Sequence, residues 1–513
     1  MKRIKVFFGN ALILAGVTLI MRTVSVLWGA YISKRIGAEG MGLFSLIMSA
    51  YAFAVTLSTS GINLSVVRLV SEELARGNGG GAVLAMRRCL AYALIFGALS
   101  AVLLFSLSGA ISENILGEAR AGMSLKALSV SLPFIAISNV FSGYFTAVKR
   151  IYKSAVSNIV EQLLKIGIIF GALGVLAPRG TEYACLALVI GTSVSEGLSF
   201  SYMLVLYLVD KRRHIKKTDV SAPPHLTKRM LGISLPIAFS AYLRSGLSTA
   251  EHALIPRGLR QSGENASGAL SLYGVIHGMV FPLVLFPAAL CQTFASLIVP
   301  ELSELCAKYK TVKESRHIKY IVSRAVKLGM LFSVFVAGIM ATFSEELGYI
   351  VYQNELCGKY IRIFSFLIPV MYLDTVVDGM LKGLGEQLAS MRYNIIDAAV
   401  SVLLVILLLP RYGIYGYVFC VFATELLNAA LSLARLIKVT GVRLDVLHCA
   451  ALPLICAAGA CALSNIAVRT TLSSPLPLAL IGTVLSAALY IVLSLIFGAV
   501  SKEERRWFGN IMK

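Results

Sequence analysis

The sequence has few charged residues for its length. Asp, Glu, Lys and Arg make up 14% of 513 residues, whereas hydrophobic residues make up 57%. A soluble protein uses about 25% charged residues, so this composition excludes a chain of soluble domains. Among the charged residues the acidic ones are fewer, with 26 Asp and Glu against 47 Lys and Arg. In a soluble protein that excess would indicate nucleic-acid binding, but here the basic residues lie between apolar runs, so we expect no nucleic-acid partner.

Motifs for chemistry on a substrate are also missing. The sequence contains no Walker A motif, no His-Glu-x-x-His zinc motif and no Asp-x-Asp. We therefore predict that the protein is not an enzyme and has no ATP motor, metal site or bound cofactor of its own. Its nine cysteines fall almost entirely in apolar runs or inside-facing segments, which indicates small buried side chains rather than a disulfide framework.

Long apolar runs recur along the whole chain. A helix needs about 20 apolar residues to cross a hydrocarbon core of roughly 30 Å, and the runs are continuous rather than alternating, which excludes porin-like strands. We predict an all-α integral membrane protein with about 14 transmembrane helices. The predicted spans are 8–31, 41–63, 84–107, 123–147, 154–177, 184–208, 230–255, 269–297, 325–343, 360–381, 389–409, 413–436, 447–468 and 477–498.

Lys and Arg residues are unevenly distributed over the gaps between these spans. With the N-terminus inside, the cytoplasmic segments hold roughly three times as many of them as the opposite side, as the positive-inside rule requires. We therefore predict a multi-pass protein of the cell membrane with both termini in the cytoplasm.

The two halves of the sequence repeat each other. Arg22 and Arg35 lie 13 residues apart, and Arg244 and Arg257 have the same separation. Four further positions share their offsets, namely Pro133, Gly143, Asn158 and Glu161 in the first half and Pro369, Gly379, Asn394 and Asp397 in the second. Each half would have six spans, so we expect the halves to be related by an axis along the membrane normal, with a central cavity between them.

The duplication also divides the chain. We predict an N-terminal six-helix bundle over residues 1–210, a cytoplasmic linker over 211–229 and a C-terminal six-helix bundle over 230–440. Residues 441–513 would add two further helices and a cytoplasmic tail. Such an arrangement is typical of transporters whose halves rock around a shared site.

Two arginines lie deep in predicted spans. At about 1.5 Å per helical residue, Arg22 and Arg244 are well inside the hydrophobic slab. A charge there costs at least about 2.5 kcal/mol, so it should face a cavity or a partner. As a symmetry-related pair they are candidates for a clamp on an anionic, phosphate-bearing substrate. The alternative is that each arginine pairs with an intramembrane carboxylate and holds helices together.

Other polar residues extend this candidate site. Arg35 and Arg257, the second members of the repeated arginine pairs, join the predicted substrate-binding set. Ser58 and Ser60 in the second span would offer hydroxyls to a polar ligand, or would serve helix packing through their small size.

Several acids lie within predicted spans and are candidates for ion coupling. Asp374 and Asp378 share a face of the tenth span with Lys382, which indicates either a path for Na⁺ or H⁺ or a salt-bridged ladder. Asp397 is a further candidate. Glu161 has Lys165 four residues later, a spacing that favours a neutralised ion pair.

With these features the chain resembles a known group of proteins. The arginine-bearing first span, the loop Gly37-Ala38-Glu39-Gly40-Met41-Gly42 and the six-plus-six-plus-two arrangement are similar to the polysaccharide-transport branch of the MOP flippase superfamily, and most closely to stage V sporulation protein B-like proteins. The resemblance implies a flippase for a polyprenyl-diphosphate-linked sugar in a Gram-positive membrane. It also implies a V-shaped cationic cavity holding Arg22 and Arg244, and a groove for the lipid tail formed by 447–468 and 477–498.

The sequence leads to one main functional hypothesis and two alternatives. The main hypothesis is a lipid-linked oligosaccharide flippase for a peptidoglycan-precursor-like substrate, working by alternating access among membrane lipids. The first alternative is a cation-coupled multidrug exporter of the MATE type, for which the carboxylates would be essential. The second is a non-transporting scaffold, whose partners would be cell-wall synthesis proteins.

Overall fold

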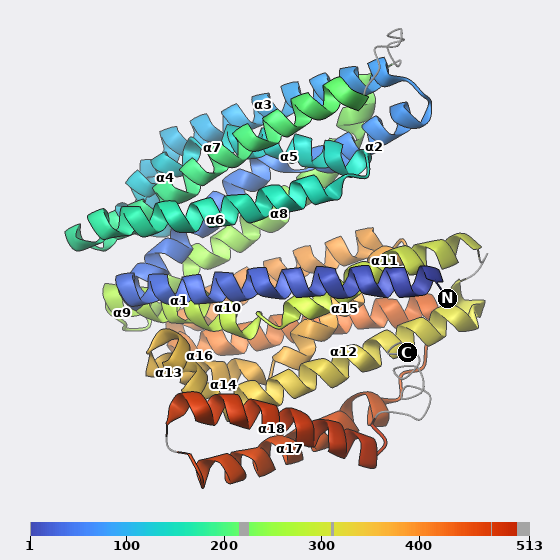
Figure 1. The fold of residues 1–513 in the computed structure, drawn as a ribbon. Helices are drawn as coiled ribbons and strands as arrows, with labels where there is room; N and C mark the ends of the chain where they lie inside the picture. The colour runs from blue at the N-terminus through green and yellow to red at the C-terminus, as the bar shows by residue number, and fades with distance from the viewer. Residues whose placement is uncertain (1, 215–224, 309–311, 473, 500–513) are drawn as a thin grey trace. The chain divides into compact units, whose positions relative to one another are not determined.

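The computed structural model describes residues 2–214, 225–308, 312–472 and 474–499. Over these ranges the protein is built from helices and contains no strand (Figure 1), which confirms the all-α prediction. Ten of the helices in the described part are long and apolar enough to cross a membrane, or up to 12 if each of two bent helix pairs forms one span. The protein is therefore a multi-pass membrane protein, whereas the count of 14 spans stays a prediction.

Helices cover each predicted span of the first half, and α2 lies between the second and third spans. The helices are α1 (Lys2–Thr59), α2 (Ile62–Ala75), α3 (Gly79–Ala110), α4 (Gly122–Ser129), α5 (Leu132–Ala147), α6 (Ile151–Leu176) and α7 (Thr181–His214). A π-helix, η1 (Ile111–Leu116), and two short 3-10 helices, η2 (Ala119–Ala121) and η3 (Ala177–Arg179), join them. The predicted linker 211–229 overlaps the end of α7 and the start of the next helix, and its residues 215–224 lie outside the described residues.

The second half is more broken. Its helices are α8 (Leu226–Gln261), α9 (Ala266–Tyr273), α10 (Phe281–Val284), α11 (Ala288–Lys308), α12 (Arg316–Thr342), α13 (Ser344–Tyr352), α14 (Glu355–Ser365), α15 (Ile368–Gly383), α16 (Gln387–Thr440), α17 (Leu452–Arg469) and α18 (Pro475–Ile496). Between them lie the π-helices η4 (Gly274–Val280) and η6 (Leu447–Ala451) and the 3-10 helix η5 (Val312–Glu314). The predicted tail falls on 500–513, outside the described residues.

The chain forms two compact units, and each contains helices from both sequence halves. Unit A consists of Arg35–Gly274 with Val402–Ile414. Unit B consists of the described residues of Met1–Lys34, Val275–Ser401 and Tyr415–Lys513. The predicted division into bundles at the linker stays a prediction.

Single glycines bend the two longest helices. Gly37 has φ 70° and ψ −179° within α1, and Gly413 has φ 55° and ψ −134° within α16. Residues other than glycine rarely adopt a positive φ, because their Cβ atom would clash with the backbone. Each glycine therefore breaks the helical path between two predicted spans, 8–31 and 41–63 in α1 and 389–409 and 413–436 in α16.

Corresponding prolines mark equivalent bends in the two halves. The α4–α5 pair bends by 47° and the α14–α15 pair by 59°. Pro133 and Pro369 stand in the first turn of α5 and α15, where a missing backbone N–H costs no helical hydrogen bond. The repeated prolines of the sequence thus begin two helices that each follow a bend.

Corresponding glycines allow equivalent close approaches. A Cβ on Gly143 of α5 would lie 3.0 Å from the carbonyl oxygen of Asn63 in α2, and one on Gly379 of α15 would lie 2.6 Å from the Cβ of Ala295 in α11. Both glycines therefore let two helix backbones pack closely. The shared local structure supports the predicted duplication.

Each unit has its own apolar core. In unit A, α2, α3, α5 and α7 bury a cluster in which the ring of Phe141 stacks on Tyr207 with centroids 4.9 Å apart. In unit B, α12 packs against α17 and α18, where Phe335 stacks on Tyr490, also at 4.9 Å. The C-terminal helix pair is therefore attached to the rest of unit B through α12, and also through α13, where Arg469 pairs with Glu346.

Candidate functional site

Both deep arginines of the sequence have exposed side chains. Arg244 lies near the middle of α8 in unit A, and Arg22 lies on α1 in unit B. Neither guanidinium makes a hydrogen bond or ion pair with another residue in the described ranges. In the described part of the chain, therefore, no intramembrane carboxylate pairs with either arginine, as the alternative of a helix-holding ion pair would require. A guanidinium within a span still needs water or an anionic partner.

Helix α8 is held along its length by neighbours within unit A. Near its first turn, the guanidinium of Arg229 donates to the carboxylate of Glu72 in α2. Further along, the hydroxyls of Ser234, Tyr242 and Thr249 bond to residues of α1 and α2, at 2.7, 3.1 and 3.0 Å respectively. Arg244 is thus presented on a helix whose position in unit A is fixed on both sides of it.

A buried carboxylate anchors the other end of α8. The Glu118 side chain, only 8% exposed, accepts from Arg260 of α8 and from Arg120 of η2, the latter at 2.9 Å. Arg120 also donates to Glu39 at 2.8 Å. The predicted site residue Arg257 donates to the carbonyl oxygen of Asn114. The network joins α1, η1, η2 and α8.

The remaining predicted substrate-binding residues lie on α1 or just after it, in unit A. Arg35 is exposed, near the bend at Gly37. Ser58 is fully buried and donates its hydroxyl to the carbonyl oxygen of Val55 at 2.8 Å, whereas Ser60 is partly exposed. A hydroxyl already bonded to its own helix suits packing, so Ser60 is the better placed of the two serines for a ligand. The assignment of all these residues to a substrate site stays a prediction.

The aspartates of unit B are bound to their surroundings. Asp378 on α15 pairs with Lys382 at 2.6 Å and accepts a hydrogen bond from Ser390. Asp374, one turn earlier, accepts from the side-chain amide of Asn428 in α16 at 3.1 Å. Asp397 lies partly buried on α16. The Asp378–Lys382 contact agrees with the ladder that the sequence offered as one alternative, and Asp374 and Asn428 form a separate polar contact between α15 and α16.

Glu161 lies in a polar cluster of unit A between α6 and α7. Its carboxyl group is hydrogen-bonded by Ser199 of α7, and Ser199 also contacts Ser157 at 3.2 Å. Lys165 of α6 interacts electrostatically with Glu161 and with Glu196 of α7. The cluster therefore combines two carboxyl groups with one ammonium group inside the predicted spans, rather than the simple Glu161–Lys165 pair that the spacing favours.

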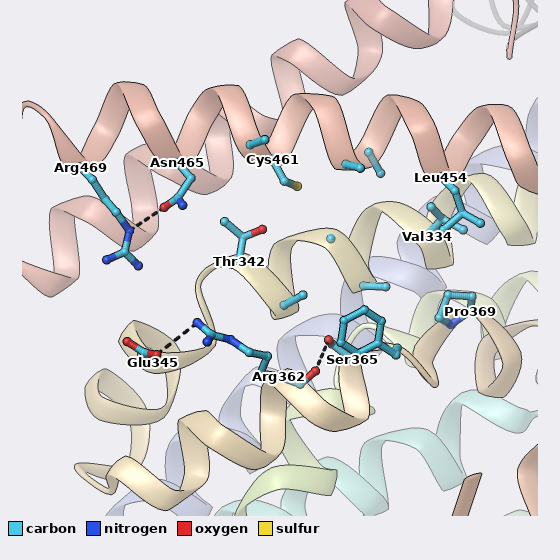
Figure 2. A pocket seen from close by; sticks show the side chains of 17 residues that line it. Val334, Thr342, Glu345, Arg362, Ser365, Pro369, Leu454, Cys461, Asn465 and Arg469 are labelled. Carbon is cyan, nitrogen blue, oxygen red and sulfur yellow. Dashed lines mark hydrogen bonds and ion pairs between the residues drawn. The ribbon is translucent and has the colours of Figure 1, made fainter. Parts of the chain in front are cut away.

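Unit B contains a pocket of about 680 Å³ lined by α12, the α14–α15 bend and α17. Figure 2 shows Val334, Leu454 and Pro369 at one end, and Glu345, Arg362 and Arg469 at the other. At the charged end, Arg362 pairs with Glu345 at 3.1 Å, and Arg469 donates to the side-chain oxygen of Asn465 at 2.7 Å. Of the two C-terminal helices expected to form a tail groove, α17 lines this pocket, and none of the pocket's described lining residues belongs to α18.

The sequence indicated only part of this pocket. The predicted tail groove over 447–468 contains the α17 lining from Leu454 to Asn465, whereas the charged residues of the mouth were not among the candidates. Arg362 and Arg469 lie near the ends of predicted spans, where arginines are common. The carboxylate that pairs with Arg469 is Glu346, 123 positions away in the sequence. One usable signal is present in α17, where the small residues Ala457, Ala458 and Ala462 recur on one face. Small side chains on a transmembrane helix leave room for a neighbour to approach.

Two family models match the chain. The model described as polysaccharide biosynthesis protein matches residues 7–288, which is more than half of the chain, and the model described as MatE matches residues 302–407. The helical membrane fold and these matches define a transporter of the MOP superfamily. The chain belongs to the polysaccharide biosynthesis protein family.

Named relatives agree with this class. Stage V sporulation protein B of Bacillus subtilis (strain 168) is 24% identical over 510 residues, which cover 98% of this chain and 97% of that protein. Lipid II flippase MurJ of the same organism is 21% identical over 433 residues, covering 76% of this chain and 74% of that protein. Neither name is that of an enzyme, in agreement with the prediction.

The fold has solved counterparts. A structure of lipid II flippase MurJ in an inward closed conformation matches with a TM-score of 0.69 and 13% sequence identity, covering 94% of this chain and 98% of that chain. The likeness confirms the predicted fold. Together with the family match it confirms the resemblance to MOP-superfamily flippases.

Proposed function

We propose that the protein moves a polyprenyl-diphosphate-linked sugar of the peptidoglycan-precursor type across the membrane by alternating access. The family match and the relative named lipid II flippase support this substrate class. The observation that carries the proposal is Arg244, an exposed guanidinium within a span that has no partner among the described residues. A diphosphate offers anionic oxygens that a guanidinium binds through two parallel hydrogen bonds.

In this proposal the headgroup and the tail travel in different surroundings. In unit A, Arg244 binds the diphosphate. Its repeat partner Arg22, together with Arg35, Arg257 and Ser60, stays a candidate contact for the headgroup. The polyprenyl chain stays in lipid along α17 and α18, because moving each methylene into water costs about 0.8 kcal/mol. The protein therefore needs a polar path for the headgroup alone.

The driving force in this proposal is the membrane potential or a coupled Na⁺ or H⁺. Asp374, Asp397 and Glu161 are the candidate coupling residues. Asp378 is the weakest candidate, because Lys382 already neutralises it.

Reconstitution in liposomes tests the proposal. We expect wild-type protein to translocate a lipid-linked oligosaccharide, and the R22A/R244A double variant to do so at a rate at least about tenfold lower. A tenfold decrease corresponds to the loss of about 1.4 kcal/mol of binding free energy. R179A is the matched control, because Arg179 is exposed in η3 outside the predicted spans. Equal rates for the double variant and the control would contradict the proposal.

One observation favours a second candidate function. The MatE model covers residues 302–407, which contain Asp374, Asp378 and Asp397. If the protein is instead a cation-coupled exporter of small amphipathic molecules, D374N and D397N would abolish efflux from the same liposomes, and the double arginine variant would not. Scoring both cargoes with both sets of variants separates the two functions.

A further inference from the structure

The pocket of unit B has the size of a ligand site and two chemically different ends. Its volume of about 680 Å³ falls within the range of about 300–1,000 Å³ that is usual for small-molecule pockets. Val334, Ala458, Phe366 and Leu454 line the apolar part, and Glu345, Arg362, Asn465 and Arg469 line the polar end. An occupant should therefore have a long apolar portion and a charged head.

The length of the pocket corresponds to one leaflet of a bilayer. Along α17 the lining runs from Leu454 to Arg469, or about 22 Å at 1.5 Å per residue. Half of a bilayer with its headgroup region is about 20–22 Å. A lipid of ordinary chain length would match this depth, whereas a much longer polyprenyl chain would extend beyond it.

Both arginines at the mouth are already paired with a carboxylate. Arg362 pairs at 3.1 Å with Glu345, which lines the pocket, and Arg469 pairs at 2.7 Å with Glu346, which is not a lining residue. The Glu345 and Arg362 side chains remain 63% and 52% exposed, so both are accessible at the mouth. A head with a phosphate alone would leave the mouth with one net negative charge next to the low-dielectric membrane. A head with a phosphate and an amine would leave it neutral, with the phosphate at the arginines and the amine at Glu345.

We propose that this pocket holds one zwitterionic membrane phospholipid with a primary amine in its head, such as phosphatidylethanolamine. Its acyl chain lies against the small residues of α17 and against α12, and its head bridges Arg362, Arg469 and Glu345. The lipid fills the seam between the C-terminal helix pair and the rest of unit B. The inference goes beyond the proposed transport function and does not depend on it.

Native mass spectrometry of the full-length protein in detergent tests lipid selectivity. The protein is titrated separately with phosphatidylethanolamine, phosphatidylglycerol and a polyprenyl phosphate, and retained molecules are counted. We expect one phosphatidylethanolamine to be retained about tenfold more strongly than either anionic lipid. Equal retention of phosphatidylglycerol would overturn the zwitterion assignment, and displacement by equimolar polyprenyl phosphate would show a site for the carrier lipid instead.

A steric variant tests the location. Ala458 and Ala462 line the pocket and are exposed there, so the A458F/A462F variant fills the space. We expect at least a tenfold loss of retained phosphatidylethanolamine. The control is L463F, because Leu463 is 53% exposed on the same helix and does not line the pocket. Unchanged retention in the filled variant would place the lipid elsewhere.

A charge variant tests the head independently of the steric variant. E345K removes the acceptor for the amine and adds a cation, so we expect the preference to invert in favour of phosphatidylglycerol. K359Q is the control, since Lys359 lies on α14 one turn from Arg362 but does not line the pocket. An unchanged preference in E345K would overturn the proposal even if the filled variant failed to fold. Neither result bears on transport, which the R22A/R244A measurement scores separately.

Discussion

Helix α8 carries arginines in two different situations. At its ends, Arg229 and Arg260 bond to the carboxylates of Glu72 and Glu118 within unit A. In its middle, Arg244 is exposed and has no hydrogen bond or ion pair with another described residue. The end arginines hold the helix in place, because breaking their pairs would leave buried or half-buried charges uncompensated. The middle arginine makes no polar contact with the described residues, which leaves its guanidinium available for an anionic ligand.

Whether an arginine of α8 is paired depends on the carboxylates that neighbouring segments supply, and not on the arginine itself. All three side chains are chemically identical, and all lie on one helix. Glu72 and Glu118 come from α2 and from the segment between η1 and η2, which lie next to the two ends of α8. Stability and ligand binding should therefore respond to different substitutions along the same helix.

The largest stability effect should come from Glu118→Ala. The Glu118 side chain is only 8% exposed and serves both Arg120 and Arg260, whose side chains are 34% and 27% exposed. Removing it leaves two guanidinium groups without their shared acceptor. Removing one partner of a fully buried ion pair lowers the free energy of unfolding by about 3–5 kcal/mol. Because these arginines are partly exposed, we expect a decrease of about 2–3 kcal/mol. Thermal unfolding in detergent measures the change. The control is E113A, at an exposed position of η1, and equal melting temperatures for the two variants would show that this network does not hold α8.

Arg244→Ala should have the opposite profile. We expect its melting temperature to match that of the wild type, because Arg244 has no partner to lose within the described residues. Transport of a lipid-linked oligosaccharide should fall about tenfold, equivalent to about 1.4 kcal/mol. Arg244→Lys keeps the charge but loses the two-pronged donor geometry, so we expect partial recovery. A drop in melting temperature without loss of transport would move Arg244 into the structural group.

The sequence was sufficient for the positions of most apolar helices and indicated the repeat. It did not indicate α2, which lies between two predicted spans, or the break between α10 and α11 inside the predicted span 269–297. Continuous apolar runs located the predicted spans, because a bilayer imposes both length and composition on a crossing helix. Pro133 and Pro369 sit at equivalent bends, as their common offset suggested. These features depend on local chemistry, which a single segment of sequence contains.

The contacts between distant segments were beyond the sequence. The Arg260–Glu118 pair joins residues 142 positions apart, and the spacing of Arg244 and Arg257 gives no indication that only Arg257 donates to a backbone carbonyl. The mouth of the pocket of unit B is equally hidden, because it combines α13, α14 and α17. Which polar residue finds a partner is decided by packing, and packing follows from the whole fold.

Arg229→Ala should have a smaller effect than Glu118→Ala at the other end of α8. The Arg229 and Glu72 side chains are 36% and 30% exposed, and Glu72 keeps a second partner in Arg68 at 3.0 Å. Exposed pairs contribute up to about 1 kcal/mol, so we expect a decrease of about 0.5–1 kcal/mol in the free energy of unfolding. Thermal unfolding of R229A beside E118A ranks the two ends. A loss in R229A as large as that in E118A would show that exposure is not what distinguishes them.

The smallest effect should come from Asp378→Asn, which applies the same contrast to the aspartates of unit B. Lys382 already neutralises Asp378 at 2.6 Å, and an asparagine side chain can still accept from Ser390. Exposed ion pairs four residues apart on a helix contribute about 0.3–0.5 kcal/mol, so we expect a stability change of that size and a transport rate close to that of the wild type. D374N serves as the comparison, because Asp374 contacts an uncharged amide rather than a cation. Measuring transport with and without a Na⁺ or H⁺ gradient tests this expectation. If D378N alone abolished the gradient dependence, a carboxylate with a close cationic partner would be part of the ion path. The presence of a partner would then no longer separate structural charges from functional ones.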